Sequence, residues 1–198
     1  GIPADGAAPR GRRVATLVMA VLVTLSFLLG LAQKSACQQI QWDIGKHGVP
    51  ASVLHDGTCY TDIPVLYRST FAHGQLPYAQ PRLTRADGSA EYLEYPVLTG
   101  VVMYAAAAVT RAFGDDDDAA EAVRYYLINV GLLWLLALLT GWTIIALSPA
   151  GRVWDALFFA VAPSLAYNGT SNWDLLPVAC TGVALVAWAA MQGGPTWA

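Results

Sequence analysis

An unbroken apolar run at residues 14–32 constrains this 198-residue chain more than any other feature. It reads "VATLVMAVLVTLSFLLGLA" and contains no charged residue. A helix of about 20 apolar residues crosses the hydrocarbon core of a bilayer, whereas the apolar core of a signal peptide is about 7–15 residues long. The run therefore predicts a retained transmembrane helix. Arginines 10, 12 and 13 precede it, so the positive-inside rule places residues 1–13 in the cytoplasm.

Four further apolar segments follow, at residues 96–113, 125–147, 154–167 and 175–191. Only 13% of the chain is charged and 56% is hydrophobic, whereas soluble domains are about 25% charged. We therefore expect an all-α integral membrane protein, a polytopic helical bundle of about four to five spans. The fourth segment is short and contains Pro163, so a full crossing and a re-entrant segment both remain open.

Residues 33–95 are polar and aromatic and contain no run of spanning length. The predicted topology places them outside the cytoplasm, where about sixty residues form an extracytoplasmic loop subdomain. Within it, Ile63, Leu66, Tyr67 and Phe71 recur at helical spacing. This pattern predicts an amphipathic helix that lies on the membrane surface.

Two segments are predicted to be loops. "PYAQPRLTRADGSAEY" contains the turn signal Asp87-Gly88, and residues 114–124, "GDDDDAAEAVR", form an acidic cytoplasmic loop. The aspartates of the second loop are read as a solvated turn, with metal binding as the alternative. The histidines are expected to be ordinary loop residues: His47, His55 and His73. The net charge of −3, without a basic stripe, gives no indication of nucleic-acid binding.

The three cysteines fall in two settings. Cys37 and Cys59 lie in the outside segment, and Cys180 lies in the fifth apolar segment. An oxidising exterior would permit a bridge between Cys37 and Cys59, and two free thiols are the alternative. No cysteine or histidine spacing is typical of a metal site.

Four carboxylates, at three places in the chain, are candidates for chemistry. Asp62 stands at the start of the predicted surface helix, where it is either a functional group or a helix cap. Glu91 and Glu94 are three residues apart and would share one face of a helix, although Glu91 also fits a solvated rim. Asp174 borders the fifth apolar segment, where a carboxylate is costly and often marks function, but it could equally cap that helix.

Taken together, "TDIPVLYRSTFAHGQLPY", "EYLEYPVLTG" and "AYNGTSNWDLLPVACTGVALVAWAA" resemble the N-terminal half of a GT-C type membrane glycosyltransferase. The resemblance is to glycosyltransferase family 87, whose actinobacterial members use polyprenol-phosphate sugars, and it spans roughly residues 14–192. The first outside loop of that family carries an Asp followed by a "Y…G…Y" helix. The corresponding positions here are Asp62, Tyr67, Gly74 and Tyr78. A family "YPP" motif is matched by Tyr95-Pro96, with Val97 replacing the second proline.

The resemblance implies an enzyme that transfers a sugar from a polyprenyl-phosphate donor to an envelope glycan or glycolipid on the extracytoplasmic face, with inversion and with Asp62 as general base. No cofactor and no metal-binding residue are expected, and the metal requirement stays open. The expected substrate-binding residues are Tyr67, Arg68, Glu94, Tyr95 and Asp174. Arg82 and Arg85 are alternatives to Arg68 for the cation that stabilises the leaving phosphate.

Two other functions remain as alternatives: a non-catalytic membrane scaffold of a cell-envelope complex, and, less favoured, a transporter. Transporters place ionisable sites near the bilayer midplane, whereas the polar residues here gather in an outside loop. GT-C enzymes usually have ten or more spans, so the chain is expected to be the N-terminal portion of a longer enzyme or a complete, shorter protein. The expected location is the cell membrane, as a multi-pass protein.

Overall fold

The computed structural model describes residues 8–35, 59–114 and 118–192 and is mostly helical. The chain divides into two compact units. The described parts of residues 1–31 and 133–198 form one, called here the terminal unit, and residues 32–132 form the other, the central unit. Helices α1 (Ala8–Ser35) and α6 (Asp118–Leu147) contribute to both units.

Two helices are long and apolar enough to cross a membrane, Arg10–Ser35 within α1 and the whole of α6. At about 1.5 Å per residue, helices of 26 and 30 residues are longer than the roughly 30 Å thickness of a hydrocarbon core. The apolar helices α5 (Val97–Ala112) and α9 (Leu175–Met191) have 16 and 17 residues and fall short of that length when straight. Length and composition thus mark two candidate spans among the described residues.

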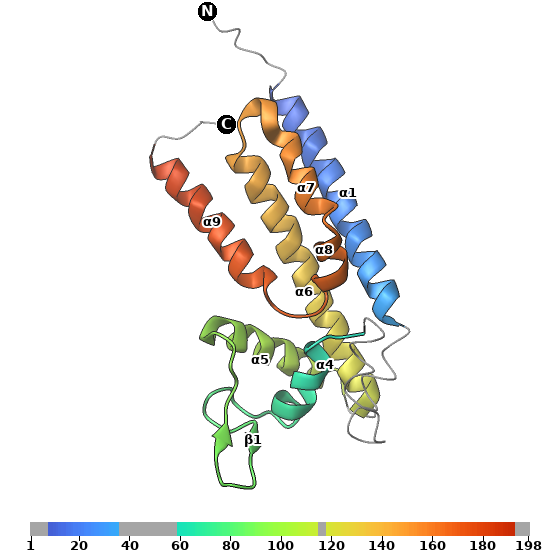
Figure 1. The fold of residues 1–198 in the computed structure, drawn as a ribbon, viewed down its shortest axis with the longest axis vertical. Coiled ribbons are helices and arrows are strands. Elements are labelled where there is room, and N and C mark those ends of the chain that lie inside the picture. Colours follow the sequence, from blue (N-terminus) through green and yellow to red (C-terminus); the bar gives the residue numbers. More distant parts are fainter. Residues whose placement is uncertain (1–7, 36–58, 115–117, 193–198) are drawn as a thin grey trace, which may run out of the picture. The chain divides into compact units, whose positions relative to one another are not determined.

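The fourth predicted segment is a broken helix (Figure 1). It consists of the 3-10 helix η2 (Ala150–Asp155), α7 (Ala156–Ala160) and α8 (Pro163–Asn168). The break precedes Pro163, whose ring disfavours a helical conformation in Ala162, and Ala162 is extended, with a ψ of 126°. The proline therefore interrupts this segment, as the sequence indicates.

Small residues allow close packing in the terminal unit. A side chain at Gly30 of α1 would meet the backbone carbonyl of Ala166 in α8, and one at Gly141 of α6 would meet the side chain of Met19. Polar side chains add specific contacts, because Trp134 donates a 3.0 Å hydrogen bond to the Thr24 hydroxyl. Close backbone approach and inter-helix hydrogen bonds of this kind are typical of helix packing in membranes.

The central unit contains α4 (Ile63–Leu66), the π-helix η1 (Tyr67–Phe71), α5 and the first part of α6. Four apolar side chains at helical spacing are buried: Ile63, Leu66, Tyr67 and Phe71. The Tyr67 ring stacks on Tyr125 of α6, with ring centroids 4.5 Å apart. The predicted helix is therefore present, but the face expected to lie on a membrane packs inside the protein instead.

The loops differ from expectation in two places. Strands β1 (Leu83–Thr84) and β2 (Ala90–Glu91) pair antiparallel within the segment predicted to be loop, with Leu83 opposite Glu91 and the Asp87-Gly88 turn between them. The acidic loop predicted at 114–124 is shorter, because α6 begins at Asp118. Asp118 and Glu121 occupy its first turn, where negative charge favours the positive end of the helix dipole.

Candidate active site at Asp62

Asp62 occupies the residue before α4, the position that a capping side chain would take. Its backbone carbonyl accepts a 2.9 Å hydrogen bond from the Leu66 amide, so the backbone begins the helix here. Its carboxylate, however, makes no capping hydrogen bond. Pro64 in the first turn has no amide to be capped, and the hydroxyl of Thr61 accepts from the Ile63 amide at 3.3 Å. The capping alternative for the Asp62 side chain is therefore wrong.

The carboxylate is held by two tyrosine hydroxyls, one on each oxygen. Tyr60 donates to Oδ1 at 2.5 Å, and Tyr95 donates to Oδ2 at 2.9 Å. We call these three residues the Asp62 site. Tyr60 comes from the segment before α4, and Tyr95 from the segment just before α5. The site thus joins two parts of the central unit that are separated by 33 residues.

The electrostatics of the site follow from these two hydrogen bonds. The bond to the Asp62 carboxylate, with a smaller effect of burial, raises the pKa of Tyr60 to about 12, so the phenol remains a donor at neutral pH. A carboxylate offers about four lone-pair positions, of which the phenols use two. Asp62 forms no ion pair with any Lys or Arg in the described parts of the chain. The half-buried carboxylate therefore keeps acceptor capacity for a further hydroxyl.

Tyr78 holds the backbone of Tyr95 in place. Its hydroxyl donates to the carbonyls of Tyr95, at 2.7 Å, and Pro96, at 3.0 Å. Tyr78 has a φ of 66°, a backbone conformation that residues other than glycine rarely adopt. Its ring lies against Gly100, where a Cβ would overlap the ring and hydroxyl. A residue keeps such a backbone conformation only where its surroundings impose it. Here the contact of Tyr78 with the start of α5 does so.

A buried lysine anchors the other tyrosine. Lys34, near the end of α1, donates a 2.8 Å hydrogen bond to the backbone carbonyl of Tyr60. Its side chain is almost fully buried. A buried ammonium is costly unless it is hydrogen-bonded, so this contact ties the Asp62 site to α1.

The predicted substrate-binding residues Tyr67 and Arg68 lie in η1. The side chain of Tyr67 is buried, which raises its pKa, and the nearby Glu121 raises it further, whereas Arg111 and Arg124 lower it. Tyr67 is therefore a core residue in this structure. Arg68 is partly exposed and follows the first residue of the π-helix, an element that often occurs at functional sites.

The two glutamates that were predicted to share one face of a helix do not lie in a helix. Glu91 belongs to β2, where it pairs with Arg82 at 3.3 Å and also contacts Arg85. Glu94 is exposed in the connection between β2 and α5. The prediction of one helical face fails because the chain is extended here. Arg82 and Arg85, both alternatives to Arg68 as the phosphate-stabilising cation, are engaged with Glu91.

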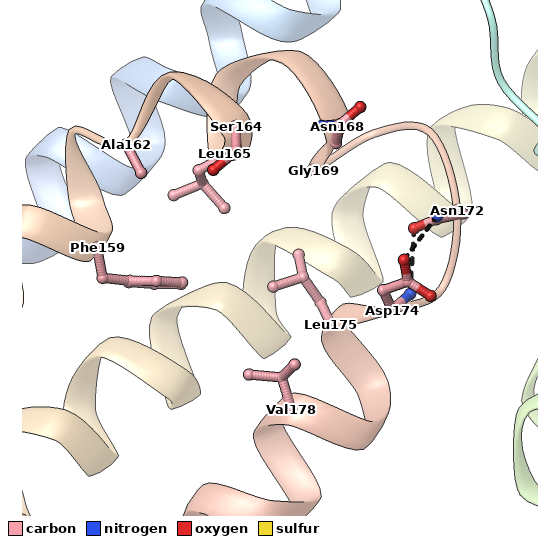
Figure 2. Close-up of a pocket in the computed structure, with 10 residues that line it drawn as sticks. All are labelled: Phe159, Ala162, Ser164, Leu165, Asn168, Gly169, Asn172, Asp174, Leu175 and Val178. Atoms are coloured by element: carbon pink, nitrogen blue, oxygen red, sulfur yellow. Dashed lines mark hydrogen bonds between the residues drawn. The ribbon is translucent and has the colours of Figure 1, made fainter.

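Asp174, in the terminal unit, lines a cavity of about 180 Å³ formed by α7, α8 and α9 (Figure 2). Its carboxylate accepts a 2.8 Å hydrogen bond from Asn172, and its amide donates to the oxygen of the Asn172 side chain at 3.2 Å. It makes no capping hydrogen bond, although it precedes α9. Phe159, Leu175 and Val178 make most of the cavity lining apolar, and Asn172 lies beside Asp174.

The remaining predicted positions are only partly described. Cys59 is disulfide-bonded, whereas Cys37, its predicted partner, lies outside the described residues. His47 and His55 also lie outside them, and His73 is exposed. No group of three His, Cys, Asp or Glu side chains suited to a metal ion occurs within residues 8–35, 59–114 and 118–192.

Sequence reasoning missed Tyr60, a member of the Asp62 site, and Lys34, which holds the backbone of Tyr60. The only available signal for Tyr60 was its place two residues before Asp62 in "CYTD", and Lys34, two residues beyond the predicted span, carried none. Comparison with protein-family models, curated proteins and solved structures finds no match for the chain.

Proposed function

We propose that this protein is a membrane glycosyltransferase, or the N-terminal portion of one, in which Asp62 acts as general base. The observation that carries the proposal is the carboxylate between two phenols, unpaired with any described cation. This side chain occupies a cap position, yet it accepts hydrogen bonds from two tyrosine hydroxyls and makes none with the helix backbone. Its orientation therefore serves a purpose other than starting the helix. The donor would be a polyprenyl-phosphate sugar and the acceptor an envelope glycan or glycolipid.

The reaction needs one proton acceptor and one stabilised leaving group. The acceptor hydroxyl would give its proton to Asp62 while its oxygen attacks the anomeric carbon of the donor sugar. The bond from that carbon to the phosphate oxygen then breaks, and its electron pair leaves with the polyprenyl phosphate. Inversion follows because attack and departure occur on opposite faces. Arg68 is the proposed cation for the phosphate, whose charge a positioned donor stabilises.

Tyr60 and Tyr95 have positioning roles in this mechanism. They fix the orientation of the carboxylate and leave its remaining lone pairs for the acceptor hydroxyl. The expected placement of residues 33–95 outside the cytoplasm, where lipid-linked sugars replace nucleotide sugars as donors, is part of the same proposal. Two apolar helices of sufficient length would anchor the protein in the membrane.

The test compares two membrane preparations, one from cells that express the native gene and one from cells that express the same gene with Asp62→Asn. Sugar transfer from labelled polyprenyl-phosphate sugars to envelope acceptors is measured at equal protein levels. Loss of a general base should lower the rate by about 10²- to 10⁴-fold. Asp87→Asn is the matched control, because Asp87 is a fully exposed aspartate in the same unit. Equal activity in both variants would remove Asp62 from the mechanism, and absence of transfer in all proteins would favour a scaffold.

A further inference from the structure

A second cavity, of about 410 Å³, lies in the terminal unit and is lined by residues from the start of α1 and the end of α6. Arg12, Arg13 and Leu17 line it from α1, and Trp142 and Ile145 line it from α6. None of the described residues that line it is acidic. The cavity therefore combines two guanidinium groups with aromatic and aliphatic surface.

Arg12 is held in place by the end of α6. Its two terminal nitrogens donate 2.7 Å hydrogen bonds to the carbonyls of Ile145 and Ser148. Carbonyls in the last turn of a helix lack intrahelical partners, so this contact caps α6. A guanidinium has five N–H donors, and the two bonds leave others available. Arg12 is thus a structural residue that also presents donors to the cavity.

Arg13 has no such structural role. Its side chain is exposed and makes no hydrogen bond or ion pair with any residue that the structure describes. The next acidic residue after α6, Asp155, is paired with Arg152 at 2.7 Å. The described start of α1 therefore carries positive charge, from Arg10, Arg12 and Arg13, without a carboxylate to offset it.

An exposed apolar stripe continues along α1 from Arg13. Leu17 is 67% exposed, and three further large side chains on the same face are also more than half exposed: Val21, Leu25 and Leu28. Their spacing of four, four and three residues places them one above another. At 1.5 Å per residue, Leu17 to Leu28 covers about 16 Å, roughly one leaflet of a 30 Å hydrocarbon core.

We propose that this cavity binds an anionic glycerophospholipid. Its phosphate lies on Arg13 and the remaining donors of Arg12, and an acyl chain follows the stripe from Leu17. Arginine binds phosphate oxygens through paired N–H groups, and Trp142, 40% exposed, has the amphipathic character of an interfacial residue. A zwitterionic lipid carries the same phosphate, but its own ammonium group offsets the charge. The excess of arginine therefore selects lipids with net negative charge.

The experiment titrates the purified 198-residue chain, in a mild detergent, with dioleoylphosphatidylglycerol or with dioleoylphosphatidylcholine. Native mass spectrometry counts the lipids bound per chain. We expect one phosphatidylglycerol to bind saturably, and Arg13→Gln to weaken its binding by about tenfold. Arg10→Gln is the matched control, because Arg10 is an exposed arginine of the same helix that does not line the cavity. It should weaken binding less than Arg13→Gln does, because it removes long-range charge but no contact in the cavity.

Leu17→Gln tests the acyl-chain part of the site and should weaken binding of both lipids. Far-UV circular dichroism checks that all variants keep their helices. Equal affinity for the two lipids, or equal losses in the Arg10 and Arg13 variants, would overturn the proposal in favour of non-specific attraction. Displacement of the lipid by excess inorganic phosphate, together with insensitivity to Leu17→Gln, would overturn it in favour of a site for free phosphate.

Discussion

The hydroxyl of Tyr95 donates a 2.9 Å hydrogen bond to the carboxylate of Asp62, which lies 33 residues earlier in the chain. This contact joins the start of α5 to the start of α4. Tyr60, two residues before Asp62, donates a hydrogen bond to the other carboxylate oxygen at 2.5 Å. The orientation of Asp62 therefore depends on both a local and a distant partner, and each contribution can be measured separately.

Replacing Tyr95 by Phe should lower the free energy of unfolding by about 1 kcal/mol. A hydrogen bond to a charged group contributes about 1.5–3 kcal/mol, and partial exposure of this site reduces that value. Chemical unfolding of the purified protein in detergent measures the change. Tyr92→Phe is the control, because the exposed Tyr92 precedes the same helix by a few residues. Equal effects of both substitutions would show that the Asp62 contact adds nothing to stability.

The pKa of Tyr60 gives a prediction for the alkaline limb of the stability curve. Folding raises this pKa from 10.0 to about 12, so the folded state holds the phenolic proton more tightly. The resulting stabilisation is fully present below pH 10 and is lost as the pH rises through about 12. Asp62→Asn should return the Tyr60 transition toward pH 10 because its largest cause is removed.

Tyrosinate absorbance, taken as the difference between each protein and its Tyr60→Phe variant, isolates this group from the other tyrosines. An unchanged Tyr60 transition in the Asp62→Asn protein would contradict the hydrogen bond as the cause of the raised pKa.

Gly100→Ala should destabilise the central unit by about 1–3 kcal/mol. The new methyl group would overlap Tyr78, whose hydroxyl holds the carbonyls of Tyr95 and Pro96. Gly131→Ala is the control in the same unit, because a Cβ there meets nothing within 4 Å. Its effect should stay within about 1 kcal/mol. Thermal unfolding distinguishes the two, and comparable shifts would mean that Tyr78 relaxes without cost.

Gly30→Ala probes the terminal unit in the same way. Its Cβ would meet the backbone carbonyl of Ala166, which cannot rotate away as a side chain can, so α1 and α8 must separate. We expect a loss of about 2 kcal/mol or more. Gly11→Ala, on the same helix and with open space around its Cβ, should be close to neutral. An unchanged melting temperature for Gly30→Ala would indicate that α8 is loosely packed on α1.

The helices were predictable because long apolar runs specify both their existence and their approximate bounds. Residues 96–113 and 175–191 were predicted, and α5 and α9 occupy Val97–Ala112 and Leu175–Met191. Pro163 also marked the broken segment correctly. These features depend on composition and local backbone geometry, both of which are visible in a single sequence. Whether the shorter helices cross a membrane stays a prediction.

The surroundings of Asp62 were not predictable in the same way. Local rules suggested a helix cap, whereas the side chain turns to tyrosines, one of them distant in sequence. The pairing of Glu91 with two arginines was hidden because strands of two residues are too short to show an alternating pattern. Side-chain partners across the fold depend on how elements pack, and no local spacing rule encodes that packing.

The break before Pro163 links two positions that are far apart in sequence. The carbonyl of Ala160 lies at the end of α7, where helix carbonyls lose their usual partners, and the hydroxyl of Ser26 on α1 donates to it at 2.8 Å. A proline in one helix thus creates an acceptor that a serine in another helix satisfies. Related chains that lose one of these residues should be free to lose the other, so positions 26 and 163 are expected to co-vary in evolution.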